Sequence, residues 1–110
     1  MAAQPRILYC HCAYARVIAP EVKNAVLNGL ASSSAEWESV PDLCEMSARR
    51  DTQVSSLASG GPIRIAACYP RVVRGLFQAA GSPLPPEARI LNMRTDTPEQ
   101  ILQSLFEVEP

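Results

Sequence analysis

Four cysteines give this chain of 110 residues a soft, thiolate-type ligand set. Two of them are separated by one residue near the start and two stand singly: Cys10, Cys12, Cys44 and Cys68. The cytosol keeps thiols reduced, so in a cytosolic protein four cysteines indicate metal ligands or redox groups more than two disulfides. The single histidine, His11, lies between the first two cysteines.

Length and composition indicate one globular domain spanning residues 1–110. The chain is 47% hydrophobic and 19% charged, which suits a single compact core and is too short for two. Ten basic and eleven acidic residues give a net charge of -1, which does not predict nucleic-acid binding. No stretch approaches the ~20 apolar residues that span a bilayer, and the start MAAQPRILYC does not resemble a signal peptide. We therefore expect a cytoplasmic protein that binds no membrane.

Short apolar runs alternate with helical patterns along the chain. The runs predict strands at residues 5–9, 37–40, 63–67 and 88–92. The helical patterns cover residues 20–30, 45–59, 72–80 and a last segment that Thr97 caps and Pro98 opens. This alternation predicts an α/β fold: a small three-layer sandwich with about four parallel strands and helices on both faces. Right-handed crossovers favour the strand order 2-1-3-4.

The cysteines fall where the predicted strands end. Cys10 and Cys12 follow the first strand, Cys44 follows the second, and Cys68 ends the third. In a parallel sheet these points lie along the carboxyl-terminal edge, where open α/β folds bind ligands. With the order 2-1-3-4 the three strands are neighbours about 4.8 Å apart. Four thiols can therefore converge on a single centre.

An all-thiolate centre suits zinc or an iron–sulfur cluster. Zinc sites usually pair their ligands as C-x₂₋₄-C, whereas the close pair here is a tighter C-x-C, which favours a cluster. Alternatively, Cys68 and Cys10 are small buried residues at strand ends, as free cysteines often are. The spacing alone leaves a metal centre and structural cysteines equally open.

Several segments resemble, in the same order, the N-terminal domain of the large iron–sulfur flavoprotein component of heterodisulfide reductase. They are LYCHC at the first strand end, the isolated Cys44, RIAACYPR (Arg64–Arg71), AAG (Ala79–Gly81) and NMR (Asn92–Arg94). The resemblance extends from Ile7 to Thr95, and all four cysteines fall in family order.

The resemblance implies a [4Fe-4S] cluster held by all four cysteines. It implies that the protein is a one-electron relay within a larger redox complex, partnered by a flavoprotein or by another iron–sulfur subunit. Arg71 and Arg94, both expected at the ligand-bearing edge, would act as cofactor-binding residues that offset the charge of the cluster and raise its potential.

The sequence also departs from the family. Ala13 and Tyr14 follow the second cysteine, where the family has glycine, and Tyr69 stands where it has a small residue. The chain ends where the family's flavin domain would begin, and it contains no GxGxxG fingerprint. We therefore expect an electron-transfer component of an oxidoreductase complex rather than a catalyst on its own.

Two alternatives stay open. One is a zinc-binding α/β module with a structural or partner-binding role. The other is a small phosphatase or arsenate reductase, because Cys68 and Arg74 match Cys-x5-Arg at a strand-to-helix turn. The loop between them lacks glycines, and Pro70 removes an amide donor. His11 is expected to face away from the thiols, because side chains alternate along an extended C-x-C segment.

Overall fold

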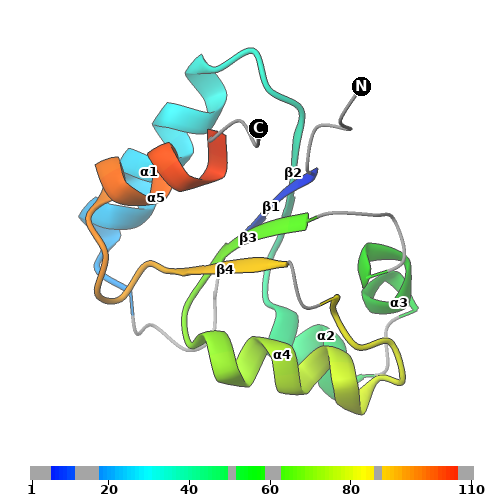
Figure 1. Cartoon of the computed structure of the whole chain (residues 1–110). Coiled ribbons are helices and arrows are strands. Elements are labelled where there is room, and N and C mark those ends of the chain that lie inside the picture. Colours follow the sequence, from blue (N-terminus) through cyan, green and yellow to red (C-terminus); the bar gives the residue numbers. More distant parts are fainter. Residues whose placement is uncertain (1–5, 12–17, 50–51, 59–62, 86–87, 107–110) are drawn as a thin grey trace.

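The computed structural model describes residues 6–11, 18–49, 52–58, 63–85 and 88–106. Four strands form one parallel sheet (Figure 1): β1 (Arg6–Cys10), β2 (Trp37–Val40), β3 (Ile63–Ala67) and β4 (Arg89–Asn92). Five helices surround it: α1 (Pro20–Ser32), α2 (Leu43–Ala48), α3 (Gln53–Ala58), α4 (Pro70–Ala79) and α5 (Pro98–Phe106). The strand order is β2-β1-β3-β4 and every pair is parallel, as predicted.

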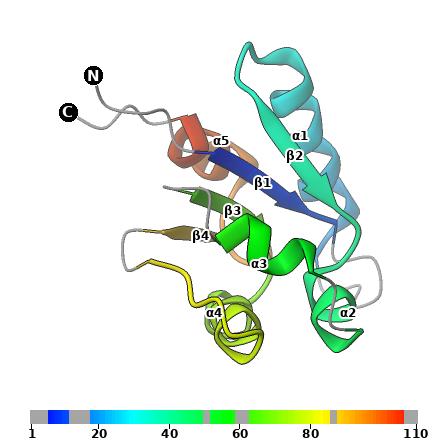
Figure 2. The same cartoon turned by 90° about the vertical axis from the view of Figure 1, so that its right-hand side faces the viewer.

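Helices cover both faces of the sheet. The pair α1 and α5 packs on one face, and α2, α3 and α4 lie on the other (Figures 1 and 2). The central strand β3 is buried at all five positions and β1 at four of its five, which is typical of parallel strands covered on two sides. The predicted three-layer α/β sandwich is confirmed.

The single helix predicted over residues 45–59 is wrong, because two short helices occupy this segment. Asp42 caps α2: its side chain accepts a hydrogen bond of 3.0 Å from the backbone N–H of Glu45. Each helix buries its own apolar pair: Leu43 and Met46 in α2, Val54 and Leu57 in α3. Both pairs have helical spacing, so the apolar pattern does not distinguish two short helices from one long one.

The helix after β3 begins at Pro70, two residues earlier than predicted. Proline fits the first helical position because the N–H it lacks would have no partner there. The sharp start leaves Cys68 and Tyr69 as the whole connection between β3 and α4. Gly81, with a φ of 79°, follows the helix and provides the predicted stop.

The last helix begins with the predicted threonine cap. The Gln100 N–H donates to Thr97 Oγ1 at 3.2 Å, and the Thr97 N–H donates to Gln100 Oε1 at 2.9 Å. This reciprocal capping box satisfies two amide groups that the helix leaves unpaired. Within the described ranges, no helix is long and apolar enough to cross a membrane.

Candidate metal centre

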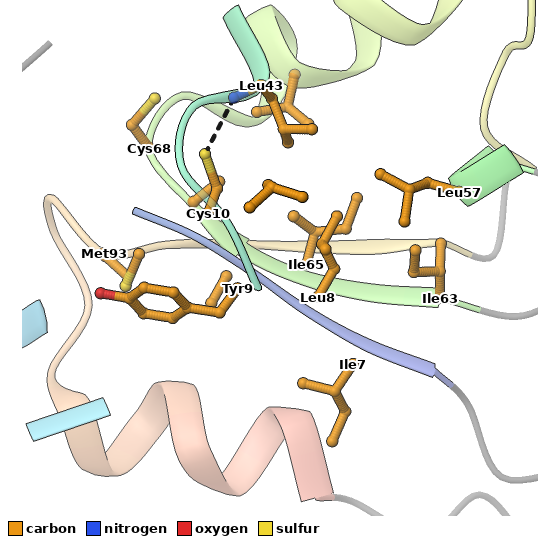
Figure 3. Close-up of a cluster of buried hydrophobic side chains, with 14 of the residues drawn as sticks. Ile7, Leu8, Tyr9, Cys10, Leu43, Leu57, Ile63, Ile65, Cys68 and Met93 are labelled. Carbon is orange, nitrogen blue, oxygen red and sulfur yellow. Dashed lines mark hydrogen bonds between the residues drawn. The ribbon is translucent and has the colours of Figure 1, made fainter. Parts of the chain in front are cut away.

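Three of the four cysteines lie at the carboxyl-terminal edge of the sheet. Cys10 is the last residue of β1, Cys44 is the second residue of α2, and Cys68 directly follows β3. Figure 3 shows Cys10 and Cys68 at the same end of the sheet, with the start of α2 beside them. The fourth predicted ligand, Cys12, lies outside the described residues.

Cys10 is 2% exposed and is held by the first residue of α2. The Leu43 N–H donates a hydrogen bond of 3.4 Å to Cys10 Sγ (Figure 3). This N–H belongs to the first turn of α2, where amide groups have no partner within the helix. The contact places a backbone hydrogen-bond donor directly beside Cys10 Sγ.

The Cys44 side chain is exposed, and it interacts electrostatically with the other two described cysteines, Cys10 and Cys68. Partial burial of its thiol raises the pKa of Cys44, and negative charge on Asp42, Cys68 and Cys10 raises it further. Ionised Cys10 and Cys68 would therefore each repel an ionised Cys44. A bound cation would reverse this effect, because it favours the thiolate forms together.

The donor atoms fit a thiophilic metal, although the described side chains do not form a coordination shell. No three His, Cys, Asp or Glu side chains in the described part of the chain are placed to hold a metal ion. Soft sulfur donors from three adjacent elements are the chemistry that zinc and iron–sulfur clusters require. The candidate site therefore consists of three described cysteines, all located at one edge of the sheet.

Both predicted arginines lie near this edge. Arg94 follows β4, and its Cζ lies 3.9 Å from the centroid of the Tyr69 ring, next to Cys68 in sequence. Arg71 is exposed in the first turn of α4. The contact between Arg94 and Tyr69 was not predicted from the sequence. The sequence held one indication of it: the third and fourth strands were predicted to be neighbours. Tyr69 and Arg94, which follow these two strands, should therefore lie close together.

His11 packs against Tyr9 rather than Cys10, and its orientation relative to Cys12, which lies outside the described residues, stays a prediction. The His11 and Tyr9 rings meet in a T-shaped arrangement at a centroid distance of 4.8 Å. Tyr9 lies on the opposite face of β1 from Cys10 (Figure 3). Burial lowers the pKa of His11, and the charge of Lys23 lowers it further. The described geometry therefore does not favour His11 as a further ligand.

The Cys-x5-Arg hypothesis finds no support in the position of Arg74. Its Nη2 donates to the carbonyl oxygen of Ala88 at 2.5 Å, and its Nη1 donates to that of Pro85 at 3.5 Å. These bonds engage the guanidinium with the segment before β4. A phosphatase-type loop needs that group to bind the oxyanion beside the cysteine thiolate.

A cavity of about 780 Å³ lies elsewhere, towards the amino-terminal edge of the sheet. The starts of β1 and β2 and the end of α5 line it, with Trp37 and Arg64 among the lining residues. None of the described cysteines lines this cavity. It is therefore separate from the thiol site.

Comparison of the chain with protein-family models, with curated proteins and with solved structures gives no match.

Proposed function

We propose that this protein is an electron-transfer domain that binds one [4Fe-4S] cluster. The ligands are the four cysteines, Cys10, Cys12, Cys44 and Cys68. The observation that carries the proposal is the placement of Cys10, Cys44 and Cys68, which come from three different elements, at the carboxyl-terminal edge of the sheet. Four thiolates match the usual ligand number of such a cluster, which accepts and donates one electron at a time when bound.

The protein contributes ligands, burial and positive charge. Cys10 and Cys68 are buried, and the Leu43 N–H donates to Cys10 Sγ. Cys68 stands two residues before the start of α4. Arg71 and Arg94 add two cationic groups at this edge. The N–H donor and the two arginines stabilise negative charge at the centre and so raise its reduction potential, whereas burial disfavours that charge and lowers it.

The resemblance to the N-terminal domain of the heterodisulfide reductase flavoprotein supports the same function. It suggests a relay inside a larger redox complex, in which the donor or acceptor is a flavoprotein or another iron–sulfur protein. The domain needs no substrate pocket for this role. The reducing cytoplasm suits it, because thiols there remain available as ligands.

Metal analysis of anaerobically purified protein tests the proposal. We expect about four irons and four sulfides per chain, and a broad absorption near 400 nm that dithionite bleaches. Serine at any one of the four cysteine positions should lower the iron content, whereas Ser47→Ala, which changes a neighbouring position of α2, should not. Four serine variants with unchanged iron would rule the cluster out.

A zinc-stabilised module is the second candidate, because an all-thiolate set also fits zinc. In that case α2 and α4 would be fastened to the sheet through the metal, and the domain would serve a structural or partner-binding role. The same measurement separates the two functions. A colourless protein with about one zinc per chain would identify the zinc module.

A further inference from the structure

The largest exposed apolar side chains of the described structure lie next to Cys68. Tyr69 is 40% exposed and Val72 is 45% exposed, and both belong to the start of α4. Exposed apolar residues are usually scattered singly over a protein surface. Here two of them stand within four residues of a proposed cluster ligand.

Two exposed guanidinium groups accompany this apolar pair. Arg71 lies between the two residues in sequence, and Arg94 reaches Tyr69 from the end of β4, with Cζ 3.9 Å from the ring centroid. The backbone places Arg94 there: the Met93 N–H donates to the Ala67 carbonyl at 2.9 Å, which continues the pairing of β4 with β3. Tyr69, Arg71, Val72 and Arg94 form what we call the α4 patch.

We propose that the α4 patch docks the acidic face of a one-electron carrier protein. The inference rests on the proposed function and names the partner surface for it. Electron transfer requires close approach to the cluster, and the patch begins at the residue after Cys68. Redox complexes use small interfaces, for which a few apolar contacts with a charged rim suffice.

The charge of the α4 patch decides which carrier fits. The whole protein has a net charge of -1, so two exposed arginines form a local positive region. Among the nearby carboxylates, Asp42 is buried and caps α2, and Glu45 of α2 pairs with Arg49 at 3.3 Å, which leaves Asp96 as the acidic residue closest in sequence to Arg94. A positive patch attracts an acidic partner and discourages a basic one.

Binding to two carriers of opposite charge tests this proposal without any electron transfer. Oxidised flavodoxin, an acidic carrier, and oxidised cytochrome c, a basic one, are immobilised, and dissociation constants for the intact protein are measured by surface plasmon resonance. We expect binding to flavodoxin that is lost at about 0.5 M salt, because salt screens the attraction. Tighter binding to cytochrome c would overturn the proposal.

Matched variants locate the surface. Arg71→Gln and Arg94→Gln should each weaken flavodoxin binding roughly fivefold, and Val72→Ser should weaken it without changing the salt dependence. Arg49→Gln removes the same charge from an exposed position after α2. It should change the dissociation constant for flavodoxin less than twofold. Equal effects of the patch and control variants would contradict the α4 patch as the docking surface.

Iron and sulfide content, measured on the same preparations, separates this inference from the proposed function. A protein that holds its cluster and whose patch variants bind flavodoxin normally contradicts the docking surface alone. A protein without a cluster that binds flavodoxin through the α4 patch contradicts the cluster and leaves the docking surface supported.

Discussion

The backbone N–H of Leu43 donates a 3.4 Å hydrogen bond to the sulfur of Cys10, joining the start of α2 to the end of β1. Strand register brings them together, because Cys10 pairs with Val40, the last residue of β2. The backbone leaving β2 must therefore pass the end of β1. The same path brings Cys44, the residue after Leu43, to the thiol site.

Removing this N–H should make the proposed cluster harder to reduce. Leu43→Pro deletes that donor together with the leucine side chain, and it leaves the helix start intact, because Leu43 is the first residue of α2 and Asp42 before it is extended, as a residue before proline prefers to be. We expect the reduction potential to fall by on the order of tens of millivolts, since a hydrogen bond to sulfur stabilises negative charge. Redox titration followed by the visible absorption of the cluster measures it.

Leu43→Ala is the matched control for the proline variant. It removes the same buried side chain and keeps the N–H, so its potential should stay near that of the original protein. Potentials that fall equally in both variants would assign the effect to lost packing, and the hydrogen bond would then have no role in tuning the cluster.

Replacing either buried cysteine should lower the pKa of Cys44 in chelator-treated, reduced protein. Negative charge on Cys10 and Cys68 contributes to the raised pKa of Cys44, after the larger effect of burial. Cys10→Ser and Cys68→Ser each remove one such charge. The pH dependence of iodoacetamide alkylation, followed by mass spectrometry of the Cys44 peptide, reports the pKa. An unchanged profile in both variants would show that the thiols do not converge.

The sheet topology could be predicted because it depends on local signals. Most strands are short apolar runs, and two of the predicted strands, at residues 37–40 and 63–67, match the structure to the residue. Right-handed crossovers then restrict the order of the strands. The edge position of Cys10, Cys44 and Cys68 follows directly, since each stands at or just after a strand end.

The finer geometry of the site depends on tertiary contacts that no local pattern encodes. The donor to Cys10 exists because Asp42 caps a helix that starts at Leu43, two residues before the predicted start. The contact of Arg94 with Tyr69 depends on pairing between β3 and β4 that continues beyond the strands. Such contacts appear only once the elements are placed against one another.

His11 should titrate below the ordinary histidine value of 6.5. Burial lowers its pKa first and the charge of Lys23 lowers it further, so Lys23→Gln should bring the pKa back part of the way. Proton NMR can follow it without assignment, because the protein has a single histidine. A pKa at or above 6.5 would contradict the partial burial of His11.

The same shift makes stability depend on pH. When the folded pKa is the lower one, the unfolded chain binds more protons, so the free energy of unfolding falls as the pH drops below about 6.5. The loss should be complete once the pH lies below the folded pKa of His11. Urea denaturation at several pH values should show this decline, and His11→Gln should remove it from that window. A decline of equal size in the variant would assign it to other groups.

Replacing two helical glycines by alanine should change the free energy of unfolding in opposite directions. At Gly29 in α1, a Cβ would lie 2.7 Å from Cδ2 and 3.1 Å from Cγ of Leu102 in α5, so the whole leucine side chain must move. Overpacking of this kind costs about 1–3 kcal/mol and outweighs a gain in helix propensity of about 1 kcal/mol. At Gly75 in α4 no atom lies within 4 Å of the added Cβ, so only the gain remains.

We therefore expect Gly29→Ala to lower the free energy of unfolding by about 1 kcal/mol and Gly75→Ala to raise it by about 0.5–1 kcal/mol. The double variant Gly29→Ala with Leu102→Ala should lose less stability than the sum of its parts, because the second change removes the obstructing side chain. Additive losses, or a gain at both glycines, would mean that α1 and α5 do not pack as closely as this contact requires.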